Sequence, residues 1–123
     1  SLWKMRCETE GVIHEDIDNG KYSSRLCDCG NILRPDIIWF QDMLNEKVVQ
    51  EAIRKISSCD IFVSIGTSAV VYPAAGFPSV AKDSGAYCIE INPEKTELSQ
   101  IYDELIREKA SNGLKVLKKQ ITG

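Results

Sequence analysis

The sequence predicts an α/β fold, in which a parallel sheet with helices on both faces follows an irregular lobe that contains cysteines. Short apolar runs alternate with segments whose apolar residues recur at helical spacing. Such alternation with short connections is typical of a parallel sheet covered by helices. Residues 1–32 lack this periodicity and hold three of the five cysteines, which predicts a separate, loop-rich lobe.

Three apolar runs, at 37–40, 61–65 and 87–91, predict buried strands. Asn45 can cap a helix that begins after it, and a second helix is expected from Pro73 to Gly85, with Pro78 bending it or delaying its start. Two further helices are expected at 99–107 and 110–121. Gly113 costs the last of them roughly 1 kcal/mol as a glycine in a helix interior.

Composition narrows the class of protein. The 123 residues suffice for one domain at most, and the net charge of −3 with scattered Lys and Arg excludes a nucleic-acid partner. No apolar run approaches the roughly 20 residues of a membrane helix, and no secretory h-region is present, so a soluble, cytoplasmic protein is expected. An odd number of cysteines favours reduced thiols or a metal site over a disulfide framework.

Two short polar segments, Gly66-Thr67-Ser68 and Asn92-Pro93-Glu94, each follow a predicted strand. In a parallel sheet, ligands bind beyond the carboxyl ends of the strands. Backbone N–H groups and hydroxyls of the first segment can hold a phosphate or ribose, and Asn92 can bond to a ribose hydroxyl. From the residues alone an ordinary turn is the more common explanation of the first segment, and the absence of a Gly-x-Gly-x-x-Gly motif means that no complete dinucleotide domain is encoded.

Three segments in order resemble the sirtuins, at 30–40 (Gly-Asn-Ile-Leu-Arg-Pro-Asp-Ile-Ile-Trp-Phe), 66–75 (Gly-Thr-Ser-Ala-Val-Val-Tyr-Pro-Ala-Ala) and 90–92 (Glu-Ile-Asn). The resemblance covers nearly the whole chain and corresponds to the C-terminal half of the sirtuin catalytic domain. It implies two parts: a degenerate zinc-ribbon-like lobe at 1–32, and the C-terminal part of a Rossmann-like NAD-binding domain at 33–123.

The resemblance also implies a function. Sirtuins are NAD-dependent protein-lysine deacylases, which transfer the acyl group of a lysine to ADP-ribose and release nicotinamide. The residues implied in NAD binding are Gly66, Thr67, Ser68, Asn92, Pro93, Glu94 and Ala110. Ile38 and Phe40 would line the tunnel for the acylated lysine of a protein or peptide partner, whereas without the resemblance their apolar character favours plain core packing.

The resemblance further implies a structural zinc ion, which sirtuins hold with two Cys-x-x-Cys pairs. This sequence departs from that pattern, since Glu10 stands where the first pair needs its second cysteine and the second pair is the shorter Cys27-Asp28-Cys29. Cys7, Cys27 and Cys29 are the expected ligands, and Glu10 or His14 can complete the set. The alternative is a lobe that has lost its metal. Cys59 and Cys88 are expected to be core residues.

No catalytic residue is expected in this chain. In sirtuins the general base is a His in a His-Gly that immediately precedes a Ser-Leu like Ser1-Leu2, so the base is expected upstream and the chain alone inactive. His14 is not given this role. Two alternatives stay open: a non-enzymatic sirtuin-like binding module, which Gln41-Asp42 in place of the usual Gly-Glu favours, and an NAD-dependent ADP-ribosyltransferase.

Overall fold

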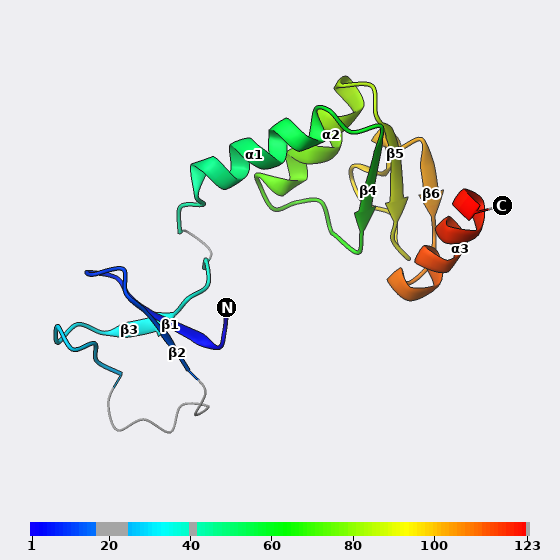
Figure 1. The fold of residues 1–123 in the computed structure, drawn as a ribbon. Helices are drawn as coiled ribbons and strands as arrows, with labels where there is room; N and C mark the ends of the chain where they lie inside the picture. The colour runs from blue at the N-terminus through cyan, green and yellow to red at the C-terminus, as the bar shows by residue number, and fades with distance from the viewer. Residues whose placement is uncertain (17–24, 40–41, 123) are drawn as a thin grey trace. The chain divides into compact units, whose positions relative to one another are not determined.

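The computed structural model describes residues 1–16, 25–39 and 42–122, and it divides into two compact units, 1–44 and 45–123 (Figure 1). The sequence prediction puts the boundary after residue 32. The chain divides later because the segment at 33–35 pairs with a strand near the N-terminus and therefore belongs to the first unit.

The first unit is built on a three-stranded antiparallel sheet in the order β2-β1-β3 (Figure 1). Its strands are β1 (Lys4–Cys7), β2 (Ile13–Glu15) and β3 (Leu33–Pro35). The sequence predicts a loop-rich lobe here and does not foresee these short strands, of which β1 directs Met5 and Cys7 inward by its two-residue alternation. Among the described residues of this unit, only Met5, Cys7 and Cys27 are buried, so its apolar core is very small.

The predicted buried strand at 37–40 was wrong. The strand in this region, β3, ends at Pro35, and Ile38 and Trp39 beyond it are 56% and 50% exposed. Phe40 lies outside the described residues. The backbone N–H of Trp39 donates to the Asp42 carboxylate (3.0 Å) and not to a neighbouring strand. An apolar run resembles a buried strand in sequence, but it forms one only where a partner strand receives its hydrogen bonds.

The second unit contains a parallel sheet in the order β4-β5-β6, formed by β4 (Ile61–Ile65), β5 (Tyr87–Ile91) and β6 (Glu104–Ile106). The first two strands confirm the prediction. The third corrects it, because the expected helix at 99–107 is a short 3-10 turn, η2 (Ser99–Ile101), followed by β6. The N–H of Asp103 donates to the carbonyl of Cys88 (2.8 Å), which starts the pairing with β5, and this tertiary pairing outweighs local propensity.

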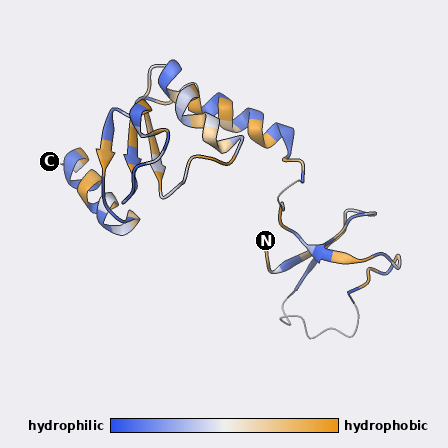
Figure 2. Cartoon of the chain, turned by 180° about the vertical axis from the view of Figure 1, so that it is seen from behind, coloured by the Kyte–Doolittle hydropathy of each residue, from blue (hydrophilic) through white to orange (hydrophobic). Residues whose placement is uncertain are grey.

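Three helices accompany this sheet, with bounds close to those expected. Helix α1 (Glu46–Ile56) begins at Asn45, whose side chain accepts from the N–H of Lys47 as predicted. A 3-10 turn, η1 (Ala74–Gly76), leads into α2 (Phe77–Asp83), with Pro78 in its first turn, and α3 (Ala110–Thr122) ends the described chain. No residue of α1 is buried, although hydrophobic and hydrophilic residues alternate along it (Figure 2).

Two apolar layers lie on opposite faces of the sheet, as the sequence predicts. Alternation along β5 directs Cys88 to one face and Ile89 and Ile91 to the other. The layer on the α2 side contains Ala81, Ala86, Cys88 and Tyr102, with Ile56, Cys59, Phe62 and Leu98 packed against them. The layer on the α3 side contains Ile89, Ile91 and Ile106, with Val63 and Leu117. The core roles expected for Cys59 and Cys88 are therefore confirmed.

No helix within the described ranges has the length and apolar character needed to cross a bilayer.

Gly113 is the point at which α3 comes closest to the sheet. It is the buried residue of α3, and a Cβ atom placed on it would lie 2.2 Å from Cγ2 of Ile91. A glycine that looks like a defect in the helix is therefore what allows α3 to pack on β5. The sequence analysis counts this glycine only as a cost to the helix, whereas in the structure the contact of α3 with β5 depends on its lack of a side chain.

We expect Gly113→Ala to lower the free energy of unfolding by about 1 to 3 kcal/mol, because the added methyl group overpacks the contact with Ile91. Chemical denaturation of the full-length protein would measure this loss. Ser111→Ala, an exposed substitution on the same helix, serves as the control and should stay within about 0.5 kcal/mol of the wild type. A stabilised Gly113→Ala protein, as helix propensity alone predicts, would contradict the close approach.

Candidate functional site

A cavity of about 350 Å³ opens at the carboxyl-terminal edge of the parallel sheet. It is lined by residues from the turns after β4 and β5, namely Gly66, Thr67, Ser68, Asn92, Glu94, Lys95, Thr96 and Glu97. The expectation that these two turns meet at one edge and enclose a hollow is confirmed. Among the described residues, Pro93 and Ala110 do not line the cavity; Pro93 lies between two lining residues, and Ala110 is the first residue of α3.

The Asn92 side chain joins the two turns. Its Nδ2 donates to the carbonyl of Thr67 (2.8 Å), and its Oδ1 accepts from the N–H of Glu94 (3.1 Å). Asn92 is only 9% exposed, so both bonds lie in a largely desolvated position, where an unmade hydrogen bond is costly. The sequence suggested a bond from Asn92 to a ribose. In the structure, part of its hydrogen-bonding capacity already fixes the shape of the cavity.

The turn after β4 has an unusual backbone. Gly66 has φ +62°, which glycine adopts without penalty, and Ala69 has φ +59°, which a residue with a side chain rarely adopts. The N–H of Ala69 donates to Oγ1 of Thr67 (3.1 Å), which helps to hold this conformation. Residues in sparsely populated conformations cluster at ligand-binding sites, and this turn lines the cavity.

Glu90 is a site residue that the sequence analysis named only as part of a motif. It lies on β5 just before the cavity and is 1% exposed. Burial by itself raises the pKa of its carboxyl, but hydrogen bonds from Ser99 and Thr96 and the ion pair with Arg107 outweigh burial, and the pKa lies below its usual range. The sequence feature that could have identified Glu90 is its position as the one charged residue in the apolar run at 87–91.

A second group of chemically active side chains lies in the first unit. One ligand atom from each of Cys7, Glu10, Cys27 and Cys29 falls within 4.8 Å of all the others. The Sγ atoms of Cys7 and Cys29 are 3.5 Å apart, and Sγ of Cys27 lies 3.6 Å from Oε2 of Glu10. The structure thus brings together the three predicted thiols and, of the two candidate partners, Glu10. Three thiols and a carboxylate fit the four-coordinate sites that zinc prefers.

The pKa values of Cys7 and Cys27 in this cluster are shifted in opposite directions. A backbone hydrogen bond at Glu10 lowers the pKa of Cys7 despite its burial. At Cys27 the backbone N–H of Cys29 acts in the same direction, but burial and the neighbouring thiols outweigh it and raise the pKa to about 11. Several thiolates in one small space repel one another, so the cluster favours a cation among them.

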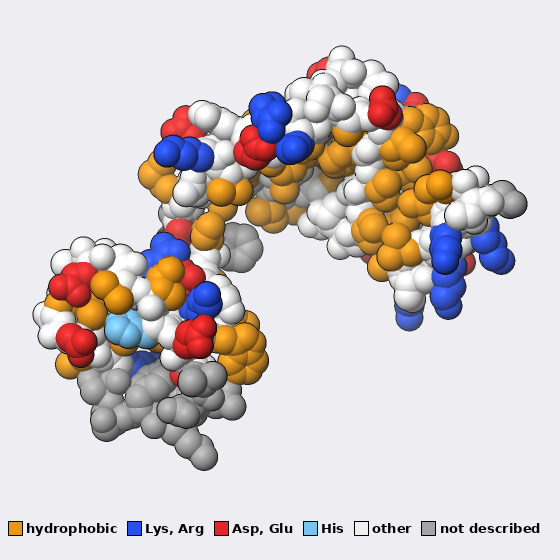
Figure 3. Space-filling model, in the orientation of Figure 1, with side chains coloured by type: hydrophobic (Ala, Val, Ile, Leu, Met, Phe, Trp, Pro, Cys, Tyr) orange, Lys and Arg blue, Asp and Glu red, His pale blue; other side chains and the backbone are white. Residues whose placement is uncertain are grey.

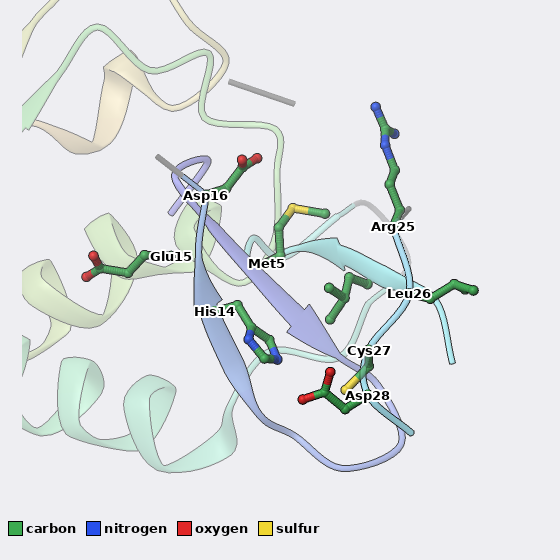
Figure 4. Close-up of a pocket in the computed structure, with 9 residues that line it drawn as sticks. Met5, His14, Glu15, Asp16, Arg25, Leu26, Cys27 and Asp28 are labelled. Carbon is green, nitrogen blue, oxygen red and sulfur yellow. The ribbon is translucent and has the colours of Figure 1, made fainter. Parts of the chain in front are cut away.

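His14, the one histidine of the sequence, is not part of this cluster. It lies on β2 and lines a pocket of about 190 Å³ that Cys27 of the cluster also lines, and its ring is directed toward the segment that carries Cys27 and Asp28 (Figure 4). Its Nε2 is enclosed by protein, whereas other parts of the side chain reach the surface, where Figure 3 shows it in pale blue. Of the two additional ligands that the sequence offered, the geometry favours Glu10 over His14.

Ile38, Trp39 and Met43, which follow β3, are exposed apolar residues, and a group of charges lies beside Ile38 and Met43. The Arg34 guanidinium donates to Glu8 (2.6 Å), to the carbonyl of Ile37 (3.3 Å) and to the Asp42 carboxylate. Arg34 therefore holds the pKa of Asp42 below its usual value. Ile38 lines a pocket of about 270 Å³ beside these charges. The sequence alone suggested core packing for Ile38, but the structure places this side chain at the surface.

Comparisons with known proteins agree with one another. The family model described as "Sir2 family" matches residues 1–73. An NAD-dependent protein deacylase of Mycobacterium tuberculosis (strain ATCC 25177 / H37Ra) is 42% identical over 120 residues, which cover 93% of this chain and 51% of that protein.

Among solved structures, a complex of a Sir2 homologue with NAD superimposes with a TM-score of 0.89 at 37% identity, over 99% of this chain and 48% of that one. Sir2 in complex with the inhibitor EX-527, 2′-O-acetyl-ADP-ribose and a deacetylated p53 peptide gives a TM-score of 0.86 at 25% identity, over 100% of this chain and 55% of that one. The chain spans about half the length of the curated relatives it matches.

Asp42→Asn tests the ion pair of Asp42 with Arg34. Because the folded state lowers the pKa of Asp42 below its ordinary 3.8, its contribution to stability is present above about pH 4 and is lost as the pH falls through the folded pKa. We expect the variant to have a lower Tm than the wild type at pH 7, and the difference to shrink as the pH falls below about 4, where Asp42 becomes protonated first in the unfolded state and then in the folded state. Thermal unfolding across this pH range measures both.

Glu51→Gln is the matched control, since it removes an exposed ion pair with Arg54 within one helix. Such pairs contribute little to stability, so its Tm should stay close to that of the wild type at every pH. An Asp42→Asn protein with the wild-type Tm at pH 7, or with a deficit that does not shrink as the pH is lowered below about 4, would contradict the role given to Arg34 and Asp42.

Proposed function

Because this chain belongs to the Sir2 family, we propose that it forms part of an NAD-dependent protein-lysine deacylase, which transfers an acyl group from lysine to ADP-ribose and releases nicotinamide. The observation that carries the proposal is the single cavity formed by the turns after β4 and β5. Ligand sites of open parallel sheets lie at this edge, and the cavity volume is within the range of small-molecule sites. The related structure with bound NAD supports the identity of the ligand.

We assign the adenosine half of NAD to this cavity. Because Gly66 has no Cβ atom, a phosphate can approach its backbone closely. The hydroxyls of Thr67 and Ser68 can form hydrogen bonds with phosphate and ribose oxygens. Asn92 and Glu94 line the opposite wall, with Pro93 proposed to hold the chain between them, and the Glu94 carboxylate can accept from ribose hydroxyls. Ala110, at the start of α3, is proposed to lie beside the adenine, where its small side chain leaves room for the base.

The proposed partner is an acylated-lysine protein or peptide, which we assign to the chain that follows β3, where Ile38 and Trp39 are exposed. Ile38 lies at the surface beside a pocket, and Phe40 is proposed to share its role. Exposed apolar residues beside charges suit an extended peptide that docks against them. The related Sir2 structure that contains a deacetylated p53 peptide supports a peptide partner.

We also propose a structural zinc ion bound by Cys7, Cys27 and Cys29, with Glu10 as the fourth ligand. The ion would supply cohesion and no chemistry to the reaction. The first unit buries only three apolar side chains among its described residues, and so small a core ordinarily needs a metal or disulfides to be stable. The two pairs of ligands come from segments about twenty residues apart, so a shared ion would hold them together.

The proposed activity is tested by titrating the full-length protein with NAD and an acetylated peptide and measuring nicotinamide release. We expect one nicotinamide for each peptide deacylated. Ser68→Ala should raise the KM for NAD about tenfold, the value of one lost hydrogen bond, whereas Ser58→Ala, at the other end of β4, should leave it unchanged.

Two outcomes would contradict this function in distinguishable ways. NAD binding without turnover would indicate the non-enzymatic module. Protein labelled by ADP-ribose, with no deacylated peptide, would indicate the ADP-ribosyltransferase.

Metal content tests the zinc proposal. We expect about one zinc per chain by elemental analysis, lost in Cys29→Ser and retained in Cys59→Ala, because Cys59 packs in the sheet core. Glu10→Gln should release the ion at a lower chelator concentration than the wild type does. A purified wild-type protein without zinc, or a Cys29→Ser protein that keeps it, would overturn the assignment.

A further inference from the structure

Glu90 places a carboxylate inside the second unit. A buried charge is costly unless it is paired and hydrogen-bonded. At Glu90, the hydroxyls of Thr96 and Ser99 donate at 2.7 and 2.6 Å, and Nη1 of Arg107 lies 2.7 Å away. Two of these partners belong to the segment that leaves β5, and the third follows β6. The carboxylate is therefore satisfied only when that segment is folded against the sheet.

Arg107 extends the same network to the backbone of the segment. Its Nη1 also lies within hydrogen-bond distance of the carbonyls of Asn92 (3.2 Å) and Glu94 (2.9 Å), and its Nη2 donates to the Ser99 hydroxyl (2.9 Å). A planar guanidinium presents several donors in fixed directions, which a lysine cannot reproduce. Arg107 thus connects the buried carboxylate to two carbonyls of residues that line the cavity.

The Ser99 hydroxyl closes the network from the other end. It accepts from the N–H of Thr96 (2.8 Å) and donates to Glu90. The segment at 92–99 is consequently held at its start by Arg107 and at its end by Glu90 and Ser99. Asn92, Glu94 and Thr96 line the cavity, whereas neither Glu90 nor Arg107 is among its described lining residues.

We propose that Glu90 and Arg107 are positioning residues that hold the segment at 92–97 in the shape that receives the adenosine half of NAD. The inference rests on the proposed function, and it assigns the pair to NAD affinity and not to the chemical step. Pre-organising a loop removes its ordering cost from binding, so the pair should act on the KM for NAD without touching the ligand.

Arg107→Lys and Glu90→Gln in the full-length protein test this inference. The first keeps the charge but loses the donors to the Asn92 and Glu94 carbonyls. The second keeps the shape but places an amide N–H₂ among groups that already donate. The control is Lys82→Met, which removes the ion pair with Asp103 at the opposite end of the same sheet.

We expect both test variants to raise the KM for NAD about tenfold or more. A change of this size corresponds to the loss of one to two hydrogen bonds to a charged group. The kcat and the KM for the acetylated peptide should stay within about twofold of the wild type, a split that a general loss of stability would not give. Hydrogen exchange at amides 94–99, measured without NAD, should be faster in the test variants and unchanged in Lys82→Met. Calorimetric titration with ADP-ribose should show the same weakening.

Three results would overturn the inference. The first is an unchanged KM for NAD in Arg107→Lys and Glu90→Gln, together with a fall in Tm similar to that of Lys82→Met. The pair would then contribute only to stability. The second is an equal fall in kcat and in both substrate affinities. The third is a wild-type protein that binds neither NAD nor ADP-ribose. This last result also refutes the proposed function, whereas the first two leave that function intact, so the two failures are distinguishable.

Discussion

The in-register pairing of three parallel strands is the constraint on which the candidate site depends. Ile65, Ile91 and Ile106 lie side by side across the sheet, so the next residue of each strand emerges at the same edge. These residues are Gly66, Asn92 and Arg107. Hydrogen bonds from Gly66 N–H to Ile91 and from Asn92 N–H to Ile106 continue the ladder into the turns. A shift of one residue in this register would separate the groups that line the cavity.

The two units use different physical means to stay folded. The second unit has an apolar layer on each face of its sheet, and the close contact of Gly113 with Ile91 brings α3 onto one of them. Among its described residues the first unit buries only Met5, Cys7 and Cys27, and two polar groups add to this small core: the thiols with Glu10, and the charges around Arg34.

The polar groups around the cavity follow a common design. Asn92 connects the two turns directly, and the Glu90–Arg107 pair forms hydrogen bonds with residues of the second turn. Such buried networks have a high energetic cost when one partner is missing and give a defined shape when all are present. A ligand that meets a preformed wall spends less of its binding free energy on ordering the protein.

The sequence by itself determined the local elements and the residue types of the site. The strands at Ile61–Ile65 and Tyr87–Ile91, the Asn45 cap and the turn residues after each strand follow from patterns within a few positions of one another. The three thiols were also named from the sequence, as ligands that the resemblance to the sirtuins implies. The family resemblance came from short motifs of the same kind.

Only the tertiary structure decided which segment completes the parallel sheet. The run at 37–40 has the apolar composition of a buried strand, and Glu104–Ile106 does not, yet β6 pairs with β5 because its backbone groups meet those of Ile89 to Ile91. The roles of Gly113, Glu90 and Glu10 likewise depend on residues distant in sequence. Contacts of this kind are set by packing and by the pairing of buried polar groups, which have no periodicity along the chain.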